Sequence, residues 1–354
     1  MTQLQNYAAG NGSEKLKIGL VGSGYVGQAY AQAFAGYSRA SLVAVADLRP
    51  EAARDMAEGL KCASFDSYES MAEAVDLDAV IVCTPPVTHP EISTYFLTRG
   101  VHVLCEKPLS IDVESARSMM ETARSAGTQL IMASKFRHVD DVVRAKSLVT
   151  SGIIGDVVLF ENSFTSQVDM SSRWNSMPQI SGGGVLIDNG THSVDMMRYF
   201  LGPLAEVHAL EGKRTQGLPV EDTVHILARS VSGVVATSDL SWTINKERES
   251  YIDIYGSQGM VSVGWRESKY RHFASPNWLK FGSGYSKSQA FRNQVDNFVL
   301  TLRGEVPSAI TVQDSLASVQ VIAAAYTALH RRQWTPVLTD DFAEELVGVK
   351  GAAL

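Results

Sequence analysis

Short runs of apolar residues alternate with amphipathic segments along the first third of the chain. The apolar runs predict buried strands over residues 18–21, 42–46, 79–83, 101–105 and 129–133. The segments between several of these runs carry apolar residues at helical spacing, which predicts helices over residues 25–37, 90–99 and 113–126. Buried strands that alternate with helices are typical of a doubly wound parallel sheet that is covered on both faces.

A different pattern begins after about residue 137. Following an expected helix over residues 141–149, alternating apolar and polar positions predict half-buried strands over residues 157–164, 207–213, 222–230, 234–242 and 251–255. In the fourth of these, Ala236 and Leu240 share one side of the strand, whereas Thr237 and Asp239 share the other. Helical spacing returns at residues 291–302 and 316–329. We therefore expect a second, α+β domain with a large, open, mostly antiparallel sheet.

Composition and charge narrow the class of protein. A chain of 354 residues suits two domains, and the 31 Lys and Arg against 38 Asp and Glu give a net charge of −7. This balance lacks the positive field that nucleic acids or anionic membranes select, so we expect neither partner. No run approaches 18 apolar residues, and residues 1–15 lack the apolar core of a signal peptide. Cys62, Cys83 and Cys105 form no disulfide or zinc pattern, and we expect a cytoplasmic protein.

Three glycines mark a candidate dinucleotide site. Gly22, Gly24 and Gly27 form a G-x-G-x-x-G motif between a predicted strand and a predicted helix, where the backbone can approach a pyrophosphate. Asp47 follows the last glycine by 20 residues, at the end of the next strand, where a carboxylate can bind an adenosine ribose. Asp47 favours NAD, but Arg49 could pair with a 2′-phosphate, so NADP stays possible. The alternative is a simple glycine turn with a surface aspartate.

Two further loops follow predicted strands at the edge where such sheets bind ligands. The first contains Thr84, Pro85 and Pro86, with His89 beyond them; it is either a cofactor contact or a stiff turn with a capping histidine. The second is Glu106-Lys107-Pro108, where the lysine can present an ammonium group to a polar substrate or can belong to a solvated turn.

A glycine triplet at residues 182–184 precedes a third candidate group. Asp188 and Asn189 are suitable N-cap residues for a helix that ends near Leu201. On such a helix Asp188, His192 and Asp195 share one face, and a histidine flanked by carboxylates can accept the proton of an alcohol. The alternative is a capping aspartate with a surface histidine. No further ligand has suitable spacing, so we expect no metal site.

Taken in order, these motifs resemble the Gfo/Idh/MocA family, which is named for glucose–fructose oxidoreductase and inositol dehydrogenase. Arg137 and the segments 151–157 and 182–195 complete the pattern, which spans about residues 16–338. The resemblance implies a Rossmann domain over residues 16–136 and a substrate-binding and oligomerisation domain over residues 137–340. A disordered lead-in over residues 1–15 and a tail over residues 341–354 are expected to frame them.

The resemblance also assigns site residues. It implies that Lys107, Asp188 and His192 are catalytic in the NAD(P)-dependent oxidation of a secondary alcohol of a sugar, sugar derivative or cyclitol, or in the reverse reduction. His192 would take the hydroxyl proton, Lys107 would stabilise the developing alkoxide, and Asp188 would orient His192 or the substrate. The implied cofactor-binding residues are Gly22, Gly24, Tyr25, Val26, Gly27, Asp47, Leu48, Arg49, Thr84, Pro85, Pro86, His89, Glu106, Lys107 and Arg137. The implied substrate-binding residues are Lys107, Lys135, Trp174, Asn175, Asp188 and His192.

The sequence departs from the family pattern at two positions. Asn175 follows Trp174 where many relatives have an arginine, so any contact of that arginine is in doubt. Lys135 stands where relatives often have a neutral residue; it either favours an acidic or phosphorylated sugar or is simply solvated.

Two other functions remain open. Some relatives use transient oxidation to eliminate a glycoside without net redox change, and a regulator could bind the dinucleotide without catalysis. The retention of Lys107, Asp188 and His192 favours an enzyme over the regulator. The open sheet leads us to expect a homodimer or homotetramer.

Overall fold

The computed structural model describes residues 15–338, and within them the chain forms two compact units. The first, which we call the Rossmann unit, contains residues 15–110, 114–138 and 287–315. The second, which we call the large-sheet unit, contains residues 111–113, 139–286 and 316–338. The expected lead-in, apart from Lys15, and the expected tail lie outside the described residues.

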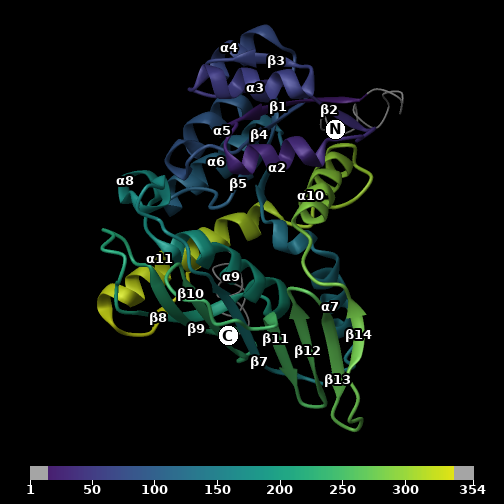
Figure 1. The fold of residues 1–354 in the computed structure, drawn as a ribbon, viewed down its shortest axis with the longest axis vertical. Coiled ribbons are helices and arrows are strands. Elements are labelled where there is room, and N and C mark those ends of the chain that lie inside the picture. The colour runs from purple at the N-terminus through teal and green to yellow at the C-terminus, as the bar shows by residue number, and fades with distance from the viewer. Residues whose placement is uncertain (1–14, 339–354) are drawn as a thin grey trace, which may run out of the picture. The chain divides into compact units, whose positions relative to one another are not determined.

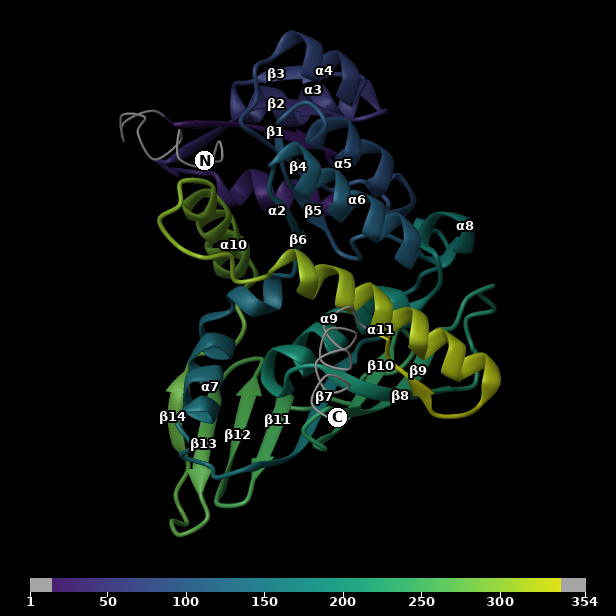
Figure 2. The same cartoon turned by 180° about the vertical axis from the view of Figure 1, so that it is seen from behind.

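The Rossmann unit is built on a six-stranded parallel sheet with the order β3-β2-β1-β4-β5-β6. Its strands are β1 (Leu16–Val21), β2 (Ala40–Ala46), β3 (Ala63–Phe65), β4 (Ala79–Val82), β5 (His102–Glu106) and β6 (Leu130–Ala133). Its helices are α2 (Tyr25–Ala33), α3 (Pro50–Leu60), α4 (Tyr68–Ala74), α5 (His89–Leu97), α6 (Val113–Ala126, its first residue assigned to the other unit) and α10 (Lys287–Leu302), with the short turns η1 (Pro86–Thr88) and η2 (Lys135–His138). Figures 1 and 2 show helices on both faces of this sheet. The expected doubly wound parallel sheet is confirmed.

Helix α10 lies far along the chain but belongs to the Rossmann unit. Its apolar side, with Phe291, Val295 and Phe298, packs into the same buried cluster as Ile18 and Tyr30. The first division between the units falls between residues 138 and 139, close to the expected boundary, but residues 287–315, which were expected in the second domain, belong to the first unit. The physical reason is that a helix is placed by the core that buries its apolar side, and this core belongs to the parallel sheet.

The large-sheet unit contains nine strands in the order β14-β13-β12-β11-β7-β10-β9-β8-β15. Strands β7 and β10 pair in parallel and the other pairs are antiparallel, which confirms the mostly antiparallel sheet. The strands are β7 (Val157–Thr165), β8 (Leu204–Glu211), β9 (Thr223–Ser230), β10 (Val235–Ser241), β11 (Ser250–Gly256), β12 (Gly259–Gly264), β13 (Ser268–His272), β14 (Leu279–Gly282) and β15 (Thr335–Pro336). The helices are α7 (Asp140–Thr150), α8 (Pro178–Ser181), α9 (Val185–Leu201) and α11 (Val312–Arg331), with the turn η3 (Trp174–Ser176); α11 begins in the other unit.

One face of this sheet is covered by helices (Figure 2). On that face Asn162 of β7 accepts hydrogen bonds from Ser193 of α9, at 2.5 Å, and from Ser238 of β10, at 2.9 Å. All three side chains are buried, so this polar network fixes α9 against the two central strands. The opposite, outer face carries the alternate residues of the same strands, such as Glu161 and Asp239. The alternation predicted for residues 234–242 is confirmed, because Ala236 and Leu240 are buried.

The main differences from the predicted elements concern segments without a strong apolar pattern. The elements that were not predicted are the helices α3, α4 and α8 and the strands β3, β12, β13, β14 and β15. In α3 the buried residues are alanines, Ala53 and Ala57, so its apolar side is weakly marked. Helix α9 begins at Val185 rather than near Asp188, with Gly184 at its N-cap; Asp188 therefore lies inside the first turn and is not the cap.

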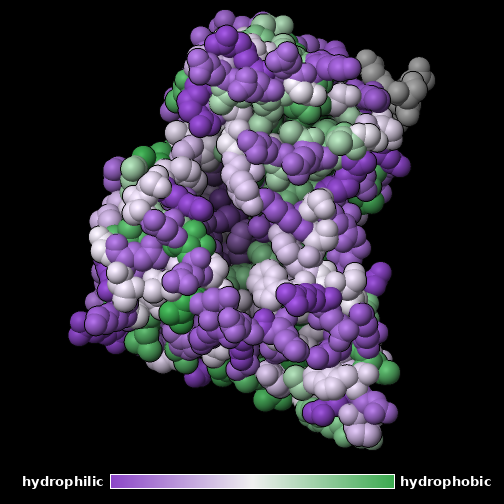
Figure 3. Space-filling view, viewed as in Figure 1, coloured by the Kyte–Doolittle hydropathy of each residue, from purple (hydrophilic) through white to green (hydrophobic). Residues whose placement is uncertain are grey.

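On the face in Figure 3, hydrophobic and hydrophilic residues are interspersed. Among residues 15–338, no helix is long and apolar enough to cross a membrane.

Candidate functional site

The three glycines of the Rossmann motif have different surroundings. Backbone atoms lie close to two of them, and the space beside the third is open to a ligand. Gly22 has φ +100°, and a Cβ there would lie 2.8 Å from the carbonyl group of Cys83. A Cβ on Gly27 would collide with the carbonyl oxygen of Gly22. By contrast, no atom lies within 4 Å of the Cβ position of Gly24, the N-cap of α2. This open helix N-terminus fits the pyrophosphate of a dinucleotide, for which the helix dipole and free N–H groups are favourable.

Asp47 lies beside this loop and is held by strong hydrogen bonds. The backbone N–H and hydroxyl of Ser23 donate to its Oδ2 atom at 2.8 and 2.7 Å, and Arg49 donates through its backbone N–H and its guanidinium. Burial alone would raise the pKa of Asp47, but the hydrogen bonds from Arg49 and Ser23 lower it to about 2. The carboxylate is therefore ionised at neutral pH, as ribose binding requires. The Arg49 side chain is 68% exposed beside it.

The two loops that follow β4 and β5 are joined by His89. Its ring is fully buried, with Nδ1 2.9 Å from the carbonyl oxygen of Pro108 and Nε2 2.8 Å from that of Thr84. Burial lowers the pKa of His89, so the ring is neutral near pH 7 and donates to one carbonyl at a time. This geometry makes His89 a brace between the loops that carry Thr84 and Lys107.

Glu106 ends β5 and sits within a set of donors and cations. Tyr30 of α2 donates to its Oε1 atom at 2.8 Å, and the backbone N–H of Lys107 donates to its Oε2 atom at 3.2 Å. Burial raises the pKa of Glu106 above its ordinary value, and the hydrogen bond from Tyr30 and the charges of Lys107 and Lys135 offset only part of this shift. The structure thus brings Glu106, Lys107 and Lys135 into one electrostatic group. Lys135 is half-buried, and its ammonium lies 5.3 Å from the ring centroid of Phe136.

Other expected cofactor residues are placed as follows. Tyr25 and Leu48 are 77% and 86% exposed, and the ammonium of Lys287 lies 3.7 Å from the Tyr25 ring centroid. Arg137 is buried and donates to the carbonyl oxygen of Ala309 and to Asp314 at the start of α11. These contacts give Arg137 a structural role within the Rossmann unit.

In the large-sheet unit, Glu221 holds the N-terminus of α9. Its Oε1 atom accepts hydrogen bonds from the N–H groups of Gly184 and Leu186, at 2.9 and 3.1 Å, and from the Tyr326 hydroxyl, at 2.8 Å. Its backbone oxygen accepts from the N–H of Val185 at 2.9 Å. A buried carboxylate thus satisfies N–H groups that every helix N-terminus leaves open. A Cβ on Gly184 would collide with the backbone of Glu221, and this close approach explains the last glycine of the triplet.

Helix α9 presents Asp188 and His192 one turn apart. Asp188 is half-buried, His192 is 8% exposed, and Asp195 is fully buried. The ring of Phe164, from β7, meets His192 edge to face at a centroid distance of 6.2 Å. Phe164 in turn contacts Tyr251 and Trp265, so an aromatic wall lies beside the histidine. A positioned imidazole next to a carboxylate and an apolar wall can serve as a general base.

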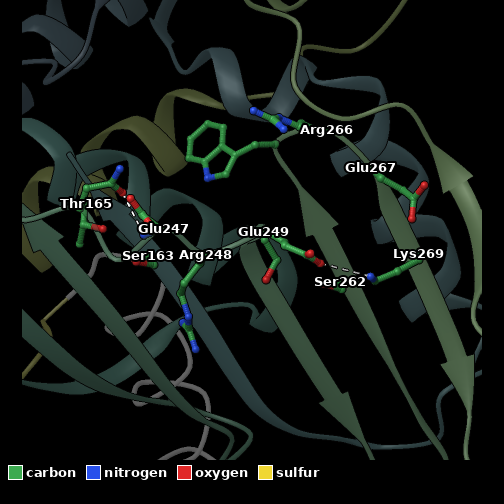
Figure 4. A pocket seen from close by; sticks show the side chains of 12 residues that line it. Ser163, Thr165, Glu247, Arg248, Glu249, Ser262, Arg266, Glu267 and Lys269 are labelled. Atoms are coloured by element: carbon green, nitrogen blue, oxygen red, sulfur yellow. Dashed lines mark hydrogen bonds and ion pairs between the residues drawn. The ribbon is translucent and has the colours of Figure 1, made fainter.

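A polar cavity of about 770 Å³ lies at the ends of β7, β11, β12 and β13 (Figure 4). Among its lining residues, Ser163 and Thr165 alternate along β7 with Phe164, which faces α9, so the cavity belongs to the outer face. Lys269 pairs there with Glu249 at 3.4 Å. Neither Asp188 nor His192 lines this cavity, and we assign no substrate to it.

The structure groups the expected residues by unit. Gly22, Asp47 and Arg49 lie at the glycine loop of the Rossmann unit. Lys107 belongs to the same unit, whereas Asp188 and His192 belong to the large-sheet unit. Trp174, 39% exposed, and Asn175 lie in η3 of the second unit. Among residues 15–338, no group of three or more His, Cys, Asp or Glu side chains could hold a metal ion.

Sequence reasoning missed four residues that position the site. Glu221 and Tyr326 hold α9, and Tyr30 and Gln294 reach Glu106. Each pair joins segments more than 70 residues apart, so no local pattern marks them.

Comparisons with known proteins agree with this geometry. Residues 16–134 match the oxidoreductase family with an NAD-binding Rossmann fold, GFO/IDH/MocA, and residues 142–262 match the GFO/IDH/MocA C-terminal domain. Inositol 2-dehydrogenase of Rhizobium meliloti (strain 1021) is 25% identical over 338 residues, which cover 90% of this chain and 98% of that protein. The 2,7-anhydro-N-acetylneuraminate hydratase of Escherichia coli (strain K12) is 25% identical over 260 residues, 72% of this chain and 68% of the relative.

A solved structure shows the same fold. Levoglucosan dehydrogenase, in complex with NADH and levoglucosan, has a TM-score of 0.83 and 20% sequence identity, and the match covers 92% of this chain and 100% of that chain. With both domains matched in order, the chain belongs to the Gfo/Idh/MocA family of NAD-binding oxidoreductases.

Proposed function

We propose that this protein oxidises a secondary alcohol of a sugar, sugar derivative or cyclitol, or reduces the corresponding ketone. Lys107, Asp188 and His192 form the catalytic group in this proposal. The observation that carries it is the arrangement on α9, where Asp188 and His192 stand one turn apart on a helix fixed by Glu221. A helix that is held this firmly can keep a general base within the tolerance that proton transfer requires.

Each residue has a stated task. NAD, when bound, accepts the hydride that leaves the carbinol carbon. His192 accepts the hydroxyl proton, and Asp188 orients the imidazole or the substrate. Lys107 places its ammonium at the oxygen where negative charge develops, so that it stabilises the transition state more than the ground state.

The names of relatives support a polyhydroxylated substrate. One is an inositol 2-dehydrogenase, and a structural neighbour contains levoglucosan. In this proposal Trp174 and Asn175 contact the substrate, and Lys135 adds a cation that favours an acidic or phosphorylated sugar.

The test is NADH formation, followed at 340 nm, with a panel of inositols, free sugars, sugar phosphates, nucleotide sugars and glycosides. The native protein is compared with Lys107→Ala and His192→Ala. The exposed residues Lys213 and His330 supply matched controls, Lys213→Ala and His330→Ala. We expect a substrate whose oxidation both site variants lose and both controls retain. Equal activity in all five proteins would remove the catalytic group from the proposal.

A second candidate is a redox-neutral reaction, in which oxidation is transient and a glycosidic bond is eliminated. The observation that favours it is the relative named a hydratase, a reaction without net redox change. Product analysis on glycosides identifies this case by release of the aglycone without accumulation of NADH. A protein that binds NAD and transforms none of these compounds would instead be a dinucleotide-sensing regulator.

We further propose that the protein is a homodimer or homotetramer that pairs through the outer face of the large sheet. Two exposed tryptophans on this unit support a docking role: Trp278 lies within 5.3 Å of Lys269 and 5.2 Å of Arg271, and Trp334 lies 5.9 Å from Arg229. Tryptophan and arginine are enriched at interfaces. Light scattering should show an oligomer that Arg229→Glu weakens; a monomeric native protein would contradict the proposal.

A further inference from the structure

A chain of buried hydrogen bonds leads from α10 to the residue next to the proposed catalytic lysine. Gln294 of α10 donates through Nε2 to the Tyr30 hydroxyl at 2.6 Å, and Tyr30 donates to Oε1 of Glu106 at 2.8 Å. Tyr30 is fully buried and Gln294 is 2% exposed. Because the amide donates to the Tyr30 oxygen, the phenolic hydrogen is directed at the carboxylate. The hydrogen bonds therefore run in one direction, from Gln294 through Tyr30 to Glu106.

Both carboxylate oxygens of Glu106 are engaged within the protein. Oε1 accepts from Tyr30, and Oε2 accepts from the backbone N–H of Lys107 at 3.2 Å. The Glu106 side chain therefore has a defined orientation, and the backbone of Lys107 is tied to it. The ring of Tyr30 is fixed as well, because Phe291 meets it edge to face at 4.9 Å from the same side of α10.

We propose that Tyr30 and Gln294 are positioning residues that hold the Glu106 carboxyl group in one orientation, and through it set the environment of Lys107 and of the neighbouring dinucleotide site. The catalytic part rests on the function proposed above, whereas the part concerning NAD binding does not. In this account α10 returns to the first unit not only to bury an apolar face but also to deliver one amide to the site.

The electrostatics supply the reason that such a relay is needed. Burial raises the pKa of Glu106, and the hydrogen bond from Tyr30 is the largest of the contributions that lower it. The charged or titratable groups that act on Glu106 and Tyr30 are Lys107, Lys135, Cys83 and Cys105. Without the phenolic donor, the carboxyl takes up a proton at a higher pH and loses the charge that faces Lys107.

The chain offers a matched control for the structural role of α10. Tyr37, which follows α2, donates to Oδ1 of Asp296 on α10 at 2.7 Å. This is the same kind of hydrogen bond between neighbouring segments, two residues from Gln294, and it does not reach Glu106. Tyr37→Phe therefore removes one hydrogen bond that docks α10 without touching the relay.

The experiment compares the native protein with Tyr30→Phe, Gln294→Met and Tyr37→Phe. NAD dissociation constants are measured by calorimetry from pH 5 to 9, and infrared difference spectra against the same variant with Glu106→Gln follow the protonated carboxyl. We expect Tyr30→Phe to weaken NAD binding about tenfold at pH 6 and less at pH 8, with the infrared titration moved to higher pH. Gln294→Met should move both readouts in the same direction by about threefold, and Tyr37→Phe should move neither.

Activity adds a third readout once a substrate is known: Tyr30→Phe should lower kcat more than it raises KM for the sugar, and its acid limb should move to higher pH. The relay is overturned if Tyr30→Phe and Tyr37→Phe give the same NAD affinities and carboxyl titration as the native protein. If Tyr30→Phe does not fold, Gln294→Met decides by the same criteria. If the NAD affinities of the variants do not follow the expected order and pH dependence, the relay alone is refuted. If they do, but the native protein oxidises no substrate, only the catalytic proposal is refuted.

Discussion

Removal of the Glu221 carboxylate should destabilise the large-sheet unit strongly. In Glu221→Ala, the N–H groups of Gly184 and Leu186 and the hydroxyl of Tyr326 lose their acceptor at once. A buried donor that is left without an acceptor costs about 1–3 kcal/mol, and such costs overlap when the donors share one partner. We therefore expect unfolding free energy to fall by about 3–5 kcal/mol, close to the cost of breaking a buried charged pair.

The assay is urea and thermal unfolding, with near-UV circular dichroism to follow tertiary packing. The loss corresponds to a decrease of the melting temperature on the order of 10 °C for a unit of this size. Glu221→Gln keeps an oxygen acceptor and loses only the charge near the helix N-terminus, so it should cost about 1–2 kcal/mol. Glu249, whose side chain is 92% exposed, gives the surface control Glu249→Ala, with an expected change within about 0.5 kcal/mol.

The same substitution connects stability with activity. Helix α9 carries Asp188 and His192, so a looser N-terminus should lower kcat in the fraction of Glu221→Ala that is folded. If Glu221→Ala unfolds within about 1 kcal/mol of the native protein, or no earlier than Glu249→Ala, then the carboxylate does not hold the helix and the reasoning fails.

Three further predictions concern the Rossmann unit. Gly24→Ala should leave the melting temperature unchanged and weaken NAD binding, because its Cβ enters open space at the helix N-terminus. Gly27→Ala should instead lower the unfolding free energy by about 1–3 kcal/mol, because its Cβ collides with the backbone. A larger loss of stability in Gly24→Ala than in Gly27→Ala would contradict this placement of the dinucleotide. Asp47→Ala should weaken NAD binding about tenfold and leave Arg49 available to a 2′-phosphate. The ratio of NADP affinity to NAD affinity, measured by calorimetry, should therefore rise, and an unchanged ratio would contradict this role of Asp47. Burial, with the charge of a neighbouring arginine, lowers the pKa of His138 to about 4 from its ordinary 6.5. The unfolded chain therefore binds this proton first, and stability is lost as the pH falls from about 6.5 to 4; His138→Gln should flatten that part of the stability curve, and a curve that keeps its slope would exclude the buried neutral histidine.

The fold was predictable where apolar periodicity is strong. The ten predicted strands lie within a few residues of observed strands, and α6 begins and ends at Val113 and Ala126 as predicted. Short and polar strands escape this prediction. The edge strand β3 has three residues, and β13, which lies between β12 and the edge strand β14, reads Ser-Lys-Tyr-Arg-His and so contains no apolar run.

The candidate site likewise contains residues that the sequence predicts and residues that it does not. The glycine loop and Asp47 are recognisable because a strand, a tight turn and a helix must follow one another within a short segment. The supports of the site are long-range: Tyr30 meets Gln294 across 264 residues, and Glu221 meets Tyr326 across 105. Only tertiary packing brings such residues together, so no sequence spacing announces them. The start of α9 was misplaced for a related reason, since its cap is supplied by Glu221 from another segment instead of by Asp188.

The most direct test of the account is the transfer of a labelled hydrogen. The best alcohol substrate from the 340 nm panel is deuterated at each carbinol carbon in turn, and the NADH formed by the native protein and by His192→Ala is analysed by mass spectrometry. We expect one labelled carbon to deliver deuterium to the NADH of the native protein, in equal amount to the ketone formed, and His192→Ala to form neither product. Turnover of the substrate without deuterium in NADH or in the product, or full transfer by His192→Ala, would contradict the assignment of this protein as a hydride-transferring alcohol oxidoreductase with His192 as its base.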